Sequence, residues 1–270
     1  MWNKIQETVN YIKSKTNYSP EYGVILGSGL GSFTDDIKIE FTLPYSEIPN
    51  FPVSTVEGHQ GALVFGIIGT KKVVAMQGRF HFYEGYSMKE VTFPVRVMNY
   101  LGIEKLIVSN ASGGVNPNYK VGSIVILKDQ INMMPEHPLR GKNDERLGPR
   151  FVNMSEPFSK KMIFKAKEIA EKLEIEVQEG VYLGLQGPTF ETLSEYRMVE
   201  KLGGDCVGMS TVPEVIVARH MDLETFGISV ITDMGNEESI KTITHAEVLE
   251  AAKNAEPQVR NLIRELIIQY

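Results

Sequence analysis

The sequence predicts an α/β fold, and three features of the chain support this prediction. Short runs rich in β-branched residues end in clusters of glycine, serine or asparagine, and stretches with helical periodicity follow them. Several of these runs are apolar at consecutive positions, as in strands whose two faces are both covered. Helix-capping motifs stand between some of them. Because no repeat, low-complexity tract or linker divides residues 1–270, we expect a single domain.

The first expected element is a helix within residues 1–15, because Ile5, Val9 and Ile12 recur on one helical face. This segment has no continuous apolar stretch and therefore does not fit a signal peptide. The predicted strands that follow are short and mostly apolar. They cover residues 22–26, 62–68, 73–76, 105–108, 123–127, 177–185, 206–208 and 227–231. No stretch reaches the ~18 apolar residues that a membrane-spanning helix needs, so no membrane partner is expected.

Capping boxes of the S/T-x-x-E type predict where two later helices begin. These boxes pair Thr192 with Glu195 and Thr244 with Glu247. Gly203 ends the first of these helices, and the second is expected to continue toward the carboxyl end of the chain. Pro257 should start a new segment of that last helix or kink it, because proline lacks the N–H that an interior helical position donates.

Two other segments depart from simple periodic elements. Ser87 and Glu90 have the capping-box spacing, but Pro94 lies too far in for an undisturbed helix. Residues 133–150 contain several prolines and little periodicity, so we expect a long excursion from the domain. Long irregular segments in compact domains are usually functional or lie at interfaces.

The composition is that of a globular protein with an acidic balance. Hydrophobic residues make up 42% of the chain, and 28 lysines and arginines face 34 aspartates and glutamates, for a net charge of −6. No run of basic residues appears, so nucleic acid is not an expected partner. The single cysteine, Cys206, has no partner for an internal disulfide or a CxxC site, which suits a reducing compartment such as the cytoplasm. We expect Cys206 to belong to the core rather than to act as a nucleophile.

Small, amide-rich loops follow two of the predicted strands, at the edge where open α/β sheets bind ligands. Residues 27–31 and 110–114 are rich in glycine and serine, so their backbone N–H groups can converge on an anion. Either loop alone is better explained as a tight strand-to-helix turn without a ligand. A dinucleotide fingerprint fits poorly, because its third glycine falls at Ser32 and prolines occupy the following segment. A nicotinamide-dependent oxidoreductase is therefore an unfavoured alternative.

The segment from residue 77 to 85 is more specific. Arg79, His81 and Tyr83 alternate along it, so in an extended chain they would project to one side and form a polar, cationic wall suited to phosphate. A merely solvated strand face is the other interpretation. His59 is a further glycine-flanked histidine, which alone would more often belong to a turn.

The remaining strand ends carry groups that suit a planar heterocycle. Phe190 with the adjacent Glu191 can stack on a ring and accept from its N–H edge, although Glu191 also fits the first turn of a helix. Met209, Ser210 and Asp233 follow two other strands. No histidine pair has the HExxH spacing, so no metal is expected.

Six of these motifs, taken together and in order, resemble the trimeric purine nucleoside phosphorylases of the nucleoside phosphorylase family. They are Gly27-Ser28-Gly29-Leu30-Gly31, Glu57-Gly58-His59-Gln60-Gly61, Gln77-Gly78-Arg79-Phe80-His81-Phe82-Tyr83-Glu84-Gly85-Tyr86, Asn110-Ala111-Ser112-Gly113-Gly114, Gly187-Pro188-Thr189-Phe190-Glu191-Thr192 and Gly208-Met209-Ser210-Thr211. The resemblance implies a single-domain nucleoside phosphorylase fold, with a mixed twisted sheet flanked by helices, and a homotrimer. It also implies reversible phosphorolysis of purine (deoxy)ribonucleosides such as inosine and guanosine, in purine salvage. Inorganic phosphate is then the co-substrate, and no cofactor is expected.

The same resemblance assigns roles to individual residues. Those implied to hold phosphate are Ser28, His59, Arg79, His81, the backbone N–H of Ala111, and Ser210. Those implied to line the ribose are Tyr83, Met209 and His245, and those implied to contact the base are Phe190, Glu191 and Asp233. The implied catalytic residues are Asp233, Glu191 and His81. Phe151 matches an aromatic residue that a neighbouring subunit contributes to the site.

Asp233 departs from this pattern, because family members specific for 6-oxopurines typically carry asparagine there. The related methylthioadenosine phosphorylases carry aspartate, but they usually lack the counterparts of Glu191 and His245. The chain thus combines marks of both groups, and a methylthioadenosine or adenosine phosphorylase is an alternative. A nucleoside-binding protein without catalysis would use the same motifs.

Overall fold

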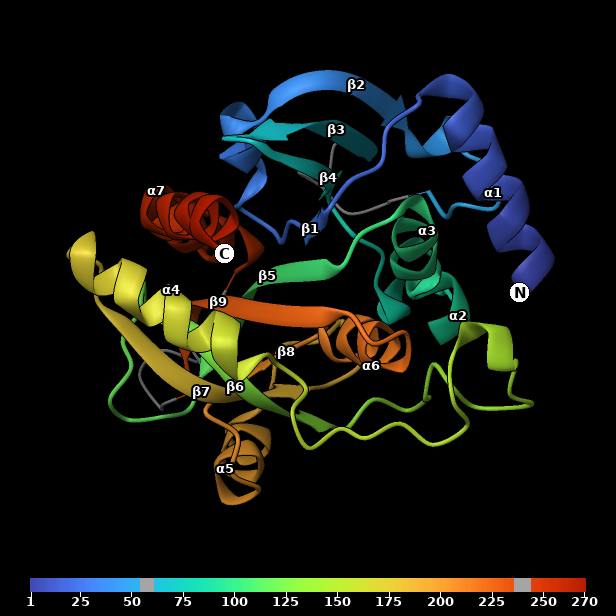
Figure 1. Ribbon diagram of the computed structural model, residues 1–270. Helices are drawn as coiled ribbons and strands as arrows, with labels where there is room; N and C mark the ends of the chain where they lie inside the picture. The colour runs from blue at the N-terminus through green and yellow to red at the C-terminus, as the bar shows by residue number, and fades with distance from the viewer. Residues whose placement is uncertain (54–60, 236–243) are drawn as a thin grey trace.

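All strands of the described chain belong to one mixed sheet. The computed structural model describes residues 1–53, 61–235 and 244–270 (Figure 1). The strands are β1 (Tyr22–Ile25), β2 (Lys38–Pro44), β3 (Ala62–Ile68), β4 (Lys71–Gln77), β5 (Lys105–Gly114), β6 (Ile124–Asn132), β7 (Val177–Gly184), β8 (Cys206–Gly208) and β9 (Glu224–Met234). Their order across the sheet is β2-β3-β4-β1-β5-β8-β7-β6-β9, with β9 also paired to β5. This confirms the α/β prediction and its mixed sheet.

The pairing of β9 with both β5 and β6 closes part of the sheet on itself. β9 runs parallel to β5 and antiparallel to β6, β6 and β8 both run parallel to β7, and β8 returns antiparallel to β5. The five strands therefore form a small closed barrel, which leaves no unpaired edge among them. The strands β2, β3, β4 and β1 extend the sheet outward from β5 (Figure 1).

Helices cover both sides of this sheet. They are α1 (Trp2–Lys15), α2 (Met88–Val91), α3 (Phe93–Leu101), α4 (Lys160–Lys172), α5 (Leu193–Lys201), α6 (Val212–His220) and α7 (His245–Gln269). α4 and α7 pack together on one side, and α1, α3 and α6 lie on the other, while α5 projects beside β7 and β8 (Figure 1). Strands sandwiched in this way are apolar at nearly every position: all four residues of β1 are buried.

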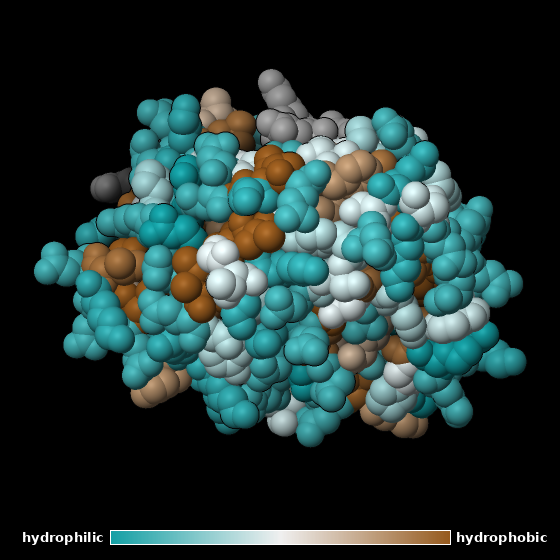
Figure 2. Space-filling view, turned by 45° about the horizontal axis from the view of Figure 1, so that its top comes forward, coloured by the Kyte–Doolittle hydropathy of each residue, from teal (hydrophilic) through white to brown (hydrophobic). Residues whose placement is uncertain are grey.

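The surface is mainly polar. On the face shown in Figure 2, hydrophilic side chains predominate and hydrophobic ones form separate patches among them. Phe151, 89% exposed, and Phe164, 67% exposed, are the most exposed large apolar side chains of the described residues. Among those residues, no helix combines the length and the apolar character that crossing a membrane requires.

The strand predictions were correct in position but too short in two important places. β5 continues through residues 110–114, which the sequence suggested to be a turn, because these residues pair with both β8 and β9. β9 likewise extends to Met234. β2 was not predicted, since its residues are mostly exposed or half-buried and their pattern is polar.

The helix predictions were confirmed at their starts and corrected at one proline. The three capping boxes are all present, and the short α2 gives way to α3 at Thr92, two residues before Pro94. α7 continues as one helix through Pro257, so the proline does not start a new segment, which was one of its two expected effects. Burial of one face, which includes Val259, Leu262 and Leu266, stabilises this helix beyond the proline. The excursion after β6 is confirmed, with one short helical turn (Glu145–Leu147).

Candidate active site

A pocket of about 690 Å³ opens where β5, β8 and β9 end, and most of the predicted site residues line it. Its lining residues are Gly27, Ser28, Arg79, His81, Tyr83, Asn110, Ala111, Ser112, Gly113, Phe190, Glu191, Val207, Gly208, Met209, Ser210, Thr232, Asp233, His245 and Val248. Segments far apart in sequence thus converge at one place, as ligand sites of α/β sheets do. Of the predicted residues, His59 lies outside the described residues, and Phe151 lies on the surface away from this pocket.

A bulge in β9 shapes one wall. The register between β5 and β9 shifts so that Ser112 is opposite Ile231 and Gly113 is opposite Asp233, which leaves Thr232 without a partner. Neighbouring strand residues normally face opposite sides, but here both Thr232 and Asp233 line the pocket. Thr232 follows a predicted strand, but it was not among the predicted site residues.

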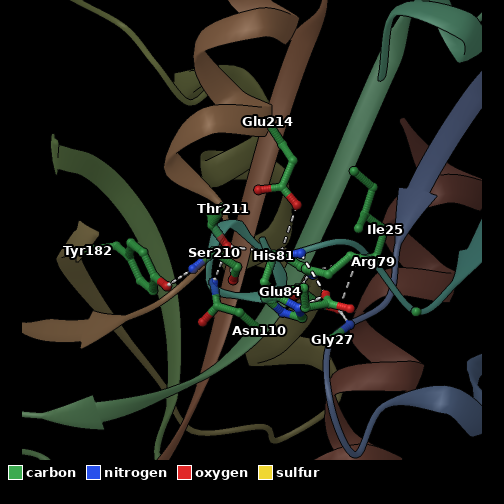
Figure 3. Close-up of polar contacts among 12 residues, drawn as sticks. Ile25, Gly27, Arg79, His81, Glu84, Asn110, Tyr182, Ser210, Thr211 and Glu214 are labelled. Atoms are coloured by element: carbon green, nitrogen blue, oxygen red, sulfur yellow. Dashed lines mark hydrogen bonds and ion pairs between the residues drawn. The ribbon is translucent and has the colours of Figure 1, made fainter. Parts of the chain in front are cut away.

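The Arg79 guanidinium is built into the wall at one end of the pocket (Figure 3). It is 2% exposed, forms an ion pair of 3.2 Å with Glu214 on α6, and donates to the Thr211 hydroxyl at 3.2 Å. It also donates to the backbone carbonyls of Ile25 and Ser109, which join it to β1 and β5. The side chain is thus fixed in place before any ligand binds.

His81 and Tyr83 reach the same end by a route that differs from the prediction. The chain turns into a short helix (Phe82–Glu84) instead of remaining extended. The two rings stack on each other, with 4.7 Å between centroids and 13° between planes. The Glu84 carboxylate lies 2.9 Å from Nδ1 of His81 and orients its ring. Burial raises the pKa of Tyr83 to about 12, so its hydroxyl remains protonated.

Thr211 connects this end of the pocket to β5. Its hydroxyl accepts from Arg79 and, at 2.9 Å, from the side-chain amide of Asn110. It has φ 68° and ψ −55°, and the Val212 N–H donates to the Ser210 carbonyl at 2.7 Å across it. This is a γ-turn of the strained kind, which is rare for a β-branched residue. Strain of this sort persists where surrounding contacts enforce it, commonly at functional sites.

Ser210 and the loop at residues 27–30 complete the cluster of donors. The Ser210 N–H donates to the hydroxyl of the completely buried Tyr182 at 3.3 Å (Figure 3). In the loop, Gly29 has φ +75°, and a Cβ there would lie 2.6 Å from the Cβ of Ala252 on α7. Only glycine suits this close approach.

The loop after β1 does not lead into a helix. It continues into a short helical turn (Gly31–Asp36) and then into β2, which pairs antiparallel with β3. The βαβ unit of a dinucleotide site is therefore missing, and the oxidoreductase alternative is not supported. Side chains of α7 fix the loop instead: Glu256 accepts from the Ser32 N–H at 2.7 Å, and Arg260 forms a bidentate pair with Asp36.

Two buried carboxyl groups line the pocket farther along β5, because Asp233 pairs with Gly113 whereas Arg79 is joined through Thr211 to Asn110. Asp233 is 7% exposed and Glu191 is 9% exposed, and Phe190 lies beside them in the lining. Burial raises the pKa of both groups. That of Glu191 reaches about 7, with a further contribution from the charge of Asp233. Hydrogen bonds from Tyr196 at 2.7 Å and Thr232 at 3.1 Å act on Asp233 in the opposite direction.

The described residues offer neither a metal site nor an activated cysteine. No group of three or more histidine, cysteine, aspartate or glutamate side chains in residues 1–53, 61–235 and 244–270 is arranged to hold a metal ion. Cys206 is completely buried, and burial raises the pKa of its thiol to about 12. It is a core residue, as predicted.

Comparisons with known proteins agree with this geometry. Residues 21–268 match the phosphorylase superfamily, so the chain belongs to this superfamily. It is 49% identical over 263 residues to purine nucleoside phosphorylase 1 of Geobacillus stearothermophilus, covering 97% of this chain and 96% of the relative. It is 48% identical to the purine nucleoside phosphorylase of Mus musculus, covering 97% and 93%.

Solved structures of purine nucleoside phosphorylase from Schistosoma mansoni have the same fold. Isoform 2, in complex with cytosine and ribose-1-phosphate, has a TM-score of 0.94 at 39% identity, with 99% of this chain and 96% of that chain covered. The complex with adenosine has a TM-score of 0.93 at 40% identity, with 99% and 97% covered. The chain is thus a member of the purine nucleoside phosphorylases within the superfamily, which confirms the resemblance.

The buried ion pair predicts a non-additive effect on stability. Arg79→Met should lower the free energy of unfolding by about 3 kcal/mol, because it leaves the Glu214 carboxylate buried without its cation. Adding Glu214→Gln should recover part of this loss by removing the uncompensated charge. Urea denaturation of the two variants measures both quantities, with Lys120→Met in an exposed ion pair as a control expected to cost less than about 1 kcal/mol. Equal and additive losses in the double variant would contradict the interpretation.

Proposed function

We propose that this chain catalyses the reversible phosphorolysis of purine nucleosides to the free base and (deoxy)ribose 1-phosphate. The observation that carries the proposal is the polarity of the pocket, which has anion-binding groups at one end and two buried carboxyls beside an aromatic ring at the other. The distribution suits a phosphate attacking one side of a sugar while a heterocyclic base leaves on the other. The names of the relatives and the ligands of the solved structures support it.

The proposed phosphate-binding groups are gathered at the end of the pocket near Arg79. They are Ser28, Arg79, His81, Ser210 and the backbone N–H of Ala111, with His59 outside the described residues. Hydroxyl, guanidinium, imidazole and amide donors together satisfy the oxygens of an anion, and the contact with a guanidinium is charge-assisted. Because the chain is acidic overall, this local cluster supplies the attraction for phosphate.

The ribose and the base are proposed to occupy the rest of the pocket. Tyr83, Met209 and His245 would contact the sugar, and Phe190 would stack on the purine. Bringing phosphate and nucleoside together in one pocket removes a large entropic part of the barrier. As the glycosidic bond stretches, the sugar becomes oxocarbenium-like and the purine gains negative charge. Bound phosphate stabilises the first charge, and a hydrogen-bond donor at purine N7 stabilises the second.

Asp233 can provide that donor only when it is protonated, because a carboxylate only accepts. Burial raises its pKa, which favours the neutral form. The protonated group would donate to N7 through one oxygen and accept from a 6-amino group through the other. Glu191, when ionised, would accept from the N1–H of a 6-oxopurine. Inosine and guanosine should therefore be good substrates, and adenosine should be tolerated better than in an enzyme with asparagine.

The proposal also covers the oligomeric state, the compartment and the metabolic role of the enzyme. We place the reaction in purine salvage in the cytoplasm, with phosphate as the co-substrate and no further cofactor, in a homotrimer. Phe151 supports the assembly, because a phenyl ring that is 89% exposed on a proline-rich segment would be covered by a neighbouring subunit. Its ring lies beside the guanidinium of Arg150, at 5.8 Å.

Phosphate dependence is the first test of this function. Base release from inosine should require phosphate and yield ribose 1-phosphate in equal amount, as measured by a coupled assay and product analysis. Ser210→Ala should raise the KM for phosphate about tenfold with a smaller effect on the KM for inosine, since a donor to the anion is lost. Equal base release in phosphate-free buffer would show a hydrolase instead.

Substitution of Asp233 tests the role of a neutral acid at the base. Asp233→Asn should lower the ratio of kcat/KM for adenosine to that for inosine, because its amide donates to N7 and a 6-oxo group. Since the active form of Asp233 is protonated, activity falls as pH rises through its pKa, and the variant should lose less activity at alkaline pH. The control is Asp129→Asn, at an exposed position on β6. An unchanged ratio would mean that Asp233 does not contact the base edge.

A pocket shared between neighbouring subunits predicts a specific effect of substituting Phe151. Phe151→Ala should raise the KM for inosine severalfold while the trimer persists in analytical ultracentrifugation, because only the contribution to the neighbouring pocket is removed. Phe164→Ala, at the other highly exposed phenyl ring, is the matched control and should leave the KM unchanged. A fully active monomer of the unaltered chain would contradict the proposal.

A further inference from the structure

Tyr196 is a buried residue next to the pocket that no motif singled out. It lies on α5, five residues after Glu191, and is 1% exposed. Two glycines make room for its ring. A Cβ at Gly235 would lie 2.4 Å from the Tyr196 ring, and a Cβ at Gly113 would lie 2.9 Å from its hydroxyl oxygen. The side chain is therefore held in one position, with its hydroxyl at the carboxyl end of the pocket.

The hydroxyl of Tyr196 acts on both carboxyl groups. It donates to Oδ2 of Asp233 at 2.7 Å, and it lies near enough to Glu191 to lower the pKa of that group as well. Burial and the two neighbouring acids raise the pKa of Tyr196, so the phenol keeps its proton. A phenol has one proton and can also accept. It can donate to one carboxylate while it accepts from the protonated form of the other.

We propose that Tyr196 is a positioning and specificity-determining residue, which joins Glu191 and Asp233 into a unit that holds one proton near neutral pH. This inference rests on the proposed function, in which both carboxyls face the purine. A proton leaves one acid for the phenol oxygen as the phenol proton passes to the other acid, so the total stays constant. The hydrogen bond from the phenol stabilises whichever carboxyl is ionised.

The number of protons on this unit decides which purine edge it matches. A 6-oxopurine presents N1–H and an N7 acceptor, so it needs ionised Glu191 and protonated Asp233, which is one proton. Adenosine presents an unprotonated N1 as well as N7, so it needs both acids protonated to receive two donors. Holding the unit at one proton thus favours 6-oxopurines, and a second proton favours adenosine.

The other charged and titratable groups described around the unit do not lower the pKa of both acids, as the phenol does. Glu195, also on α5, raises the pKa of Glu191, and the groups lining the rest of the pocket are Arg79, His81, Tyr83 and His245. Among the residues that shift the pKa of Glu191 or Asp233, Tyr196 and Thr232 are the side chains that lower it. Tyr196 acts on both, and Thr232 acts on Asp233.

Tyr196→Phe tests the inference, because it retains the ring and removes only the hydroxyl. Without the donor, the pKa of both carboxyls should rise and the unit should take up its second proton at neutral pH. The ratio of kcat/KM for adenosine to that for inosine should increase about tenfold, and the pH at which this ratio falls should move upward by about one unit. Steady-state kinetics with both nucleosides from about pH 6 to about pH 8.5 measure these changes.

Two further variants make the test specific. Tyr119→Phe removes another buried phenol, one that donates to the Glu179 carbonyl at 2.9 Å away from the pocket, and should leave the ratio and its pH dependence unchanged. In a Glu191→Gln background, both nucleosides depend on the protonation of Asp233 alone, so Tyr196→Phe should no longer shift the pH dependence of the adenosine-to-inosine ratio. Melting temperatures of all variants confirm that they are folded.

The outcomes separate this inference from the proposed function. If Tyr196→Phe lowers kcat/KM for both nucleosides by the same factor and leaves the pH dependence in place, its role is structural and the inference is wrong. Wild-type phosphorolysis would then still support the proposed function. If the wild-type chain releases no base from either nucleoside in the presence of phosphate, the proposed function itself is wrong.

Discussion

The parallel pairing of β5 with β9 is the constraint on which the site depends. This pairing closes the five-stranded barrel and brings residues 110–113 of β5 beside the end of β9. The bulge at Thr232 then aims two consecutive side chains, Thr232 and Asp233, into the same pocket. β8 pairs antiparallel with β5 at Gly113 and Gly114, so the chain at residues 207–210 approaches the pocket in the direction opposite to β5. Closing a barrel fixes these strand ends relative to one another, whereas an open edge would leave them free to shift.

The two ends of the pocket differ in how their buried charged groups are compensated. At the end that we propose to bind phosphate, the buried Arg79 guanidinium is paired with Glu214 and donates to Thr211 and to backbone carbonyls. Such an arrangement is costly to assemble and is held by a network, in which Asn110 also accepts from Ser229 at 2.6 Å. At the end that we propose to bind the base, burial acts on two acids without a cation paired to them in the described residues and raises the pKa of both, that of Glu191 to about 7. This is how an aspartate can serve where a donor is required.

Much of the fold and of the pocket could be predicted from local sequence. Apolar runs predicted the positions of eight of the nine strands, because buried strands need apolar residues on both faces, and loops rich in glycine predicted the ligand-binding edge. The capping boxes at Thr192 and Thr244 were correct because the signal lies within four residues. Family motifs then brought together residues as distant as Ser28 and His245.

What could not be predicted depends on contacts between distant segments. The extension of β5 through residues 110–114 is stabilised by pairing with β8 and β9, not by its small residues. The strained turn at Thr211 is imposed by tertiary hydrogen bonds, and the continuity of α7 through Pro257 by burial of its face. Tyr196 looks like an ordinary residue in the apolar face of a helix until its hydroxyl is placed against Asp233.

A crystal structure of the protein with hypoxanthine and ribose 1-phosphate bound tests the account most directly, because its central claim is the polarity of one pocket. We expect the phosphate group within hydrogen-bonding distance of Ser28, Ser210 and the Ala111 N–H. The N1 and N7 edge of the purine should face Glu191 and Asp233, with Tyr196 still bonded to Asp233. A purine bound at the Arg79 end, or phosphate bound beside the two carboxyls, would contradict the assignment of the two ends.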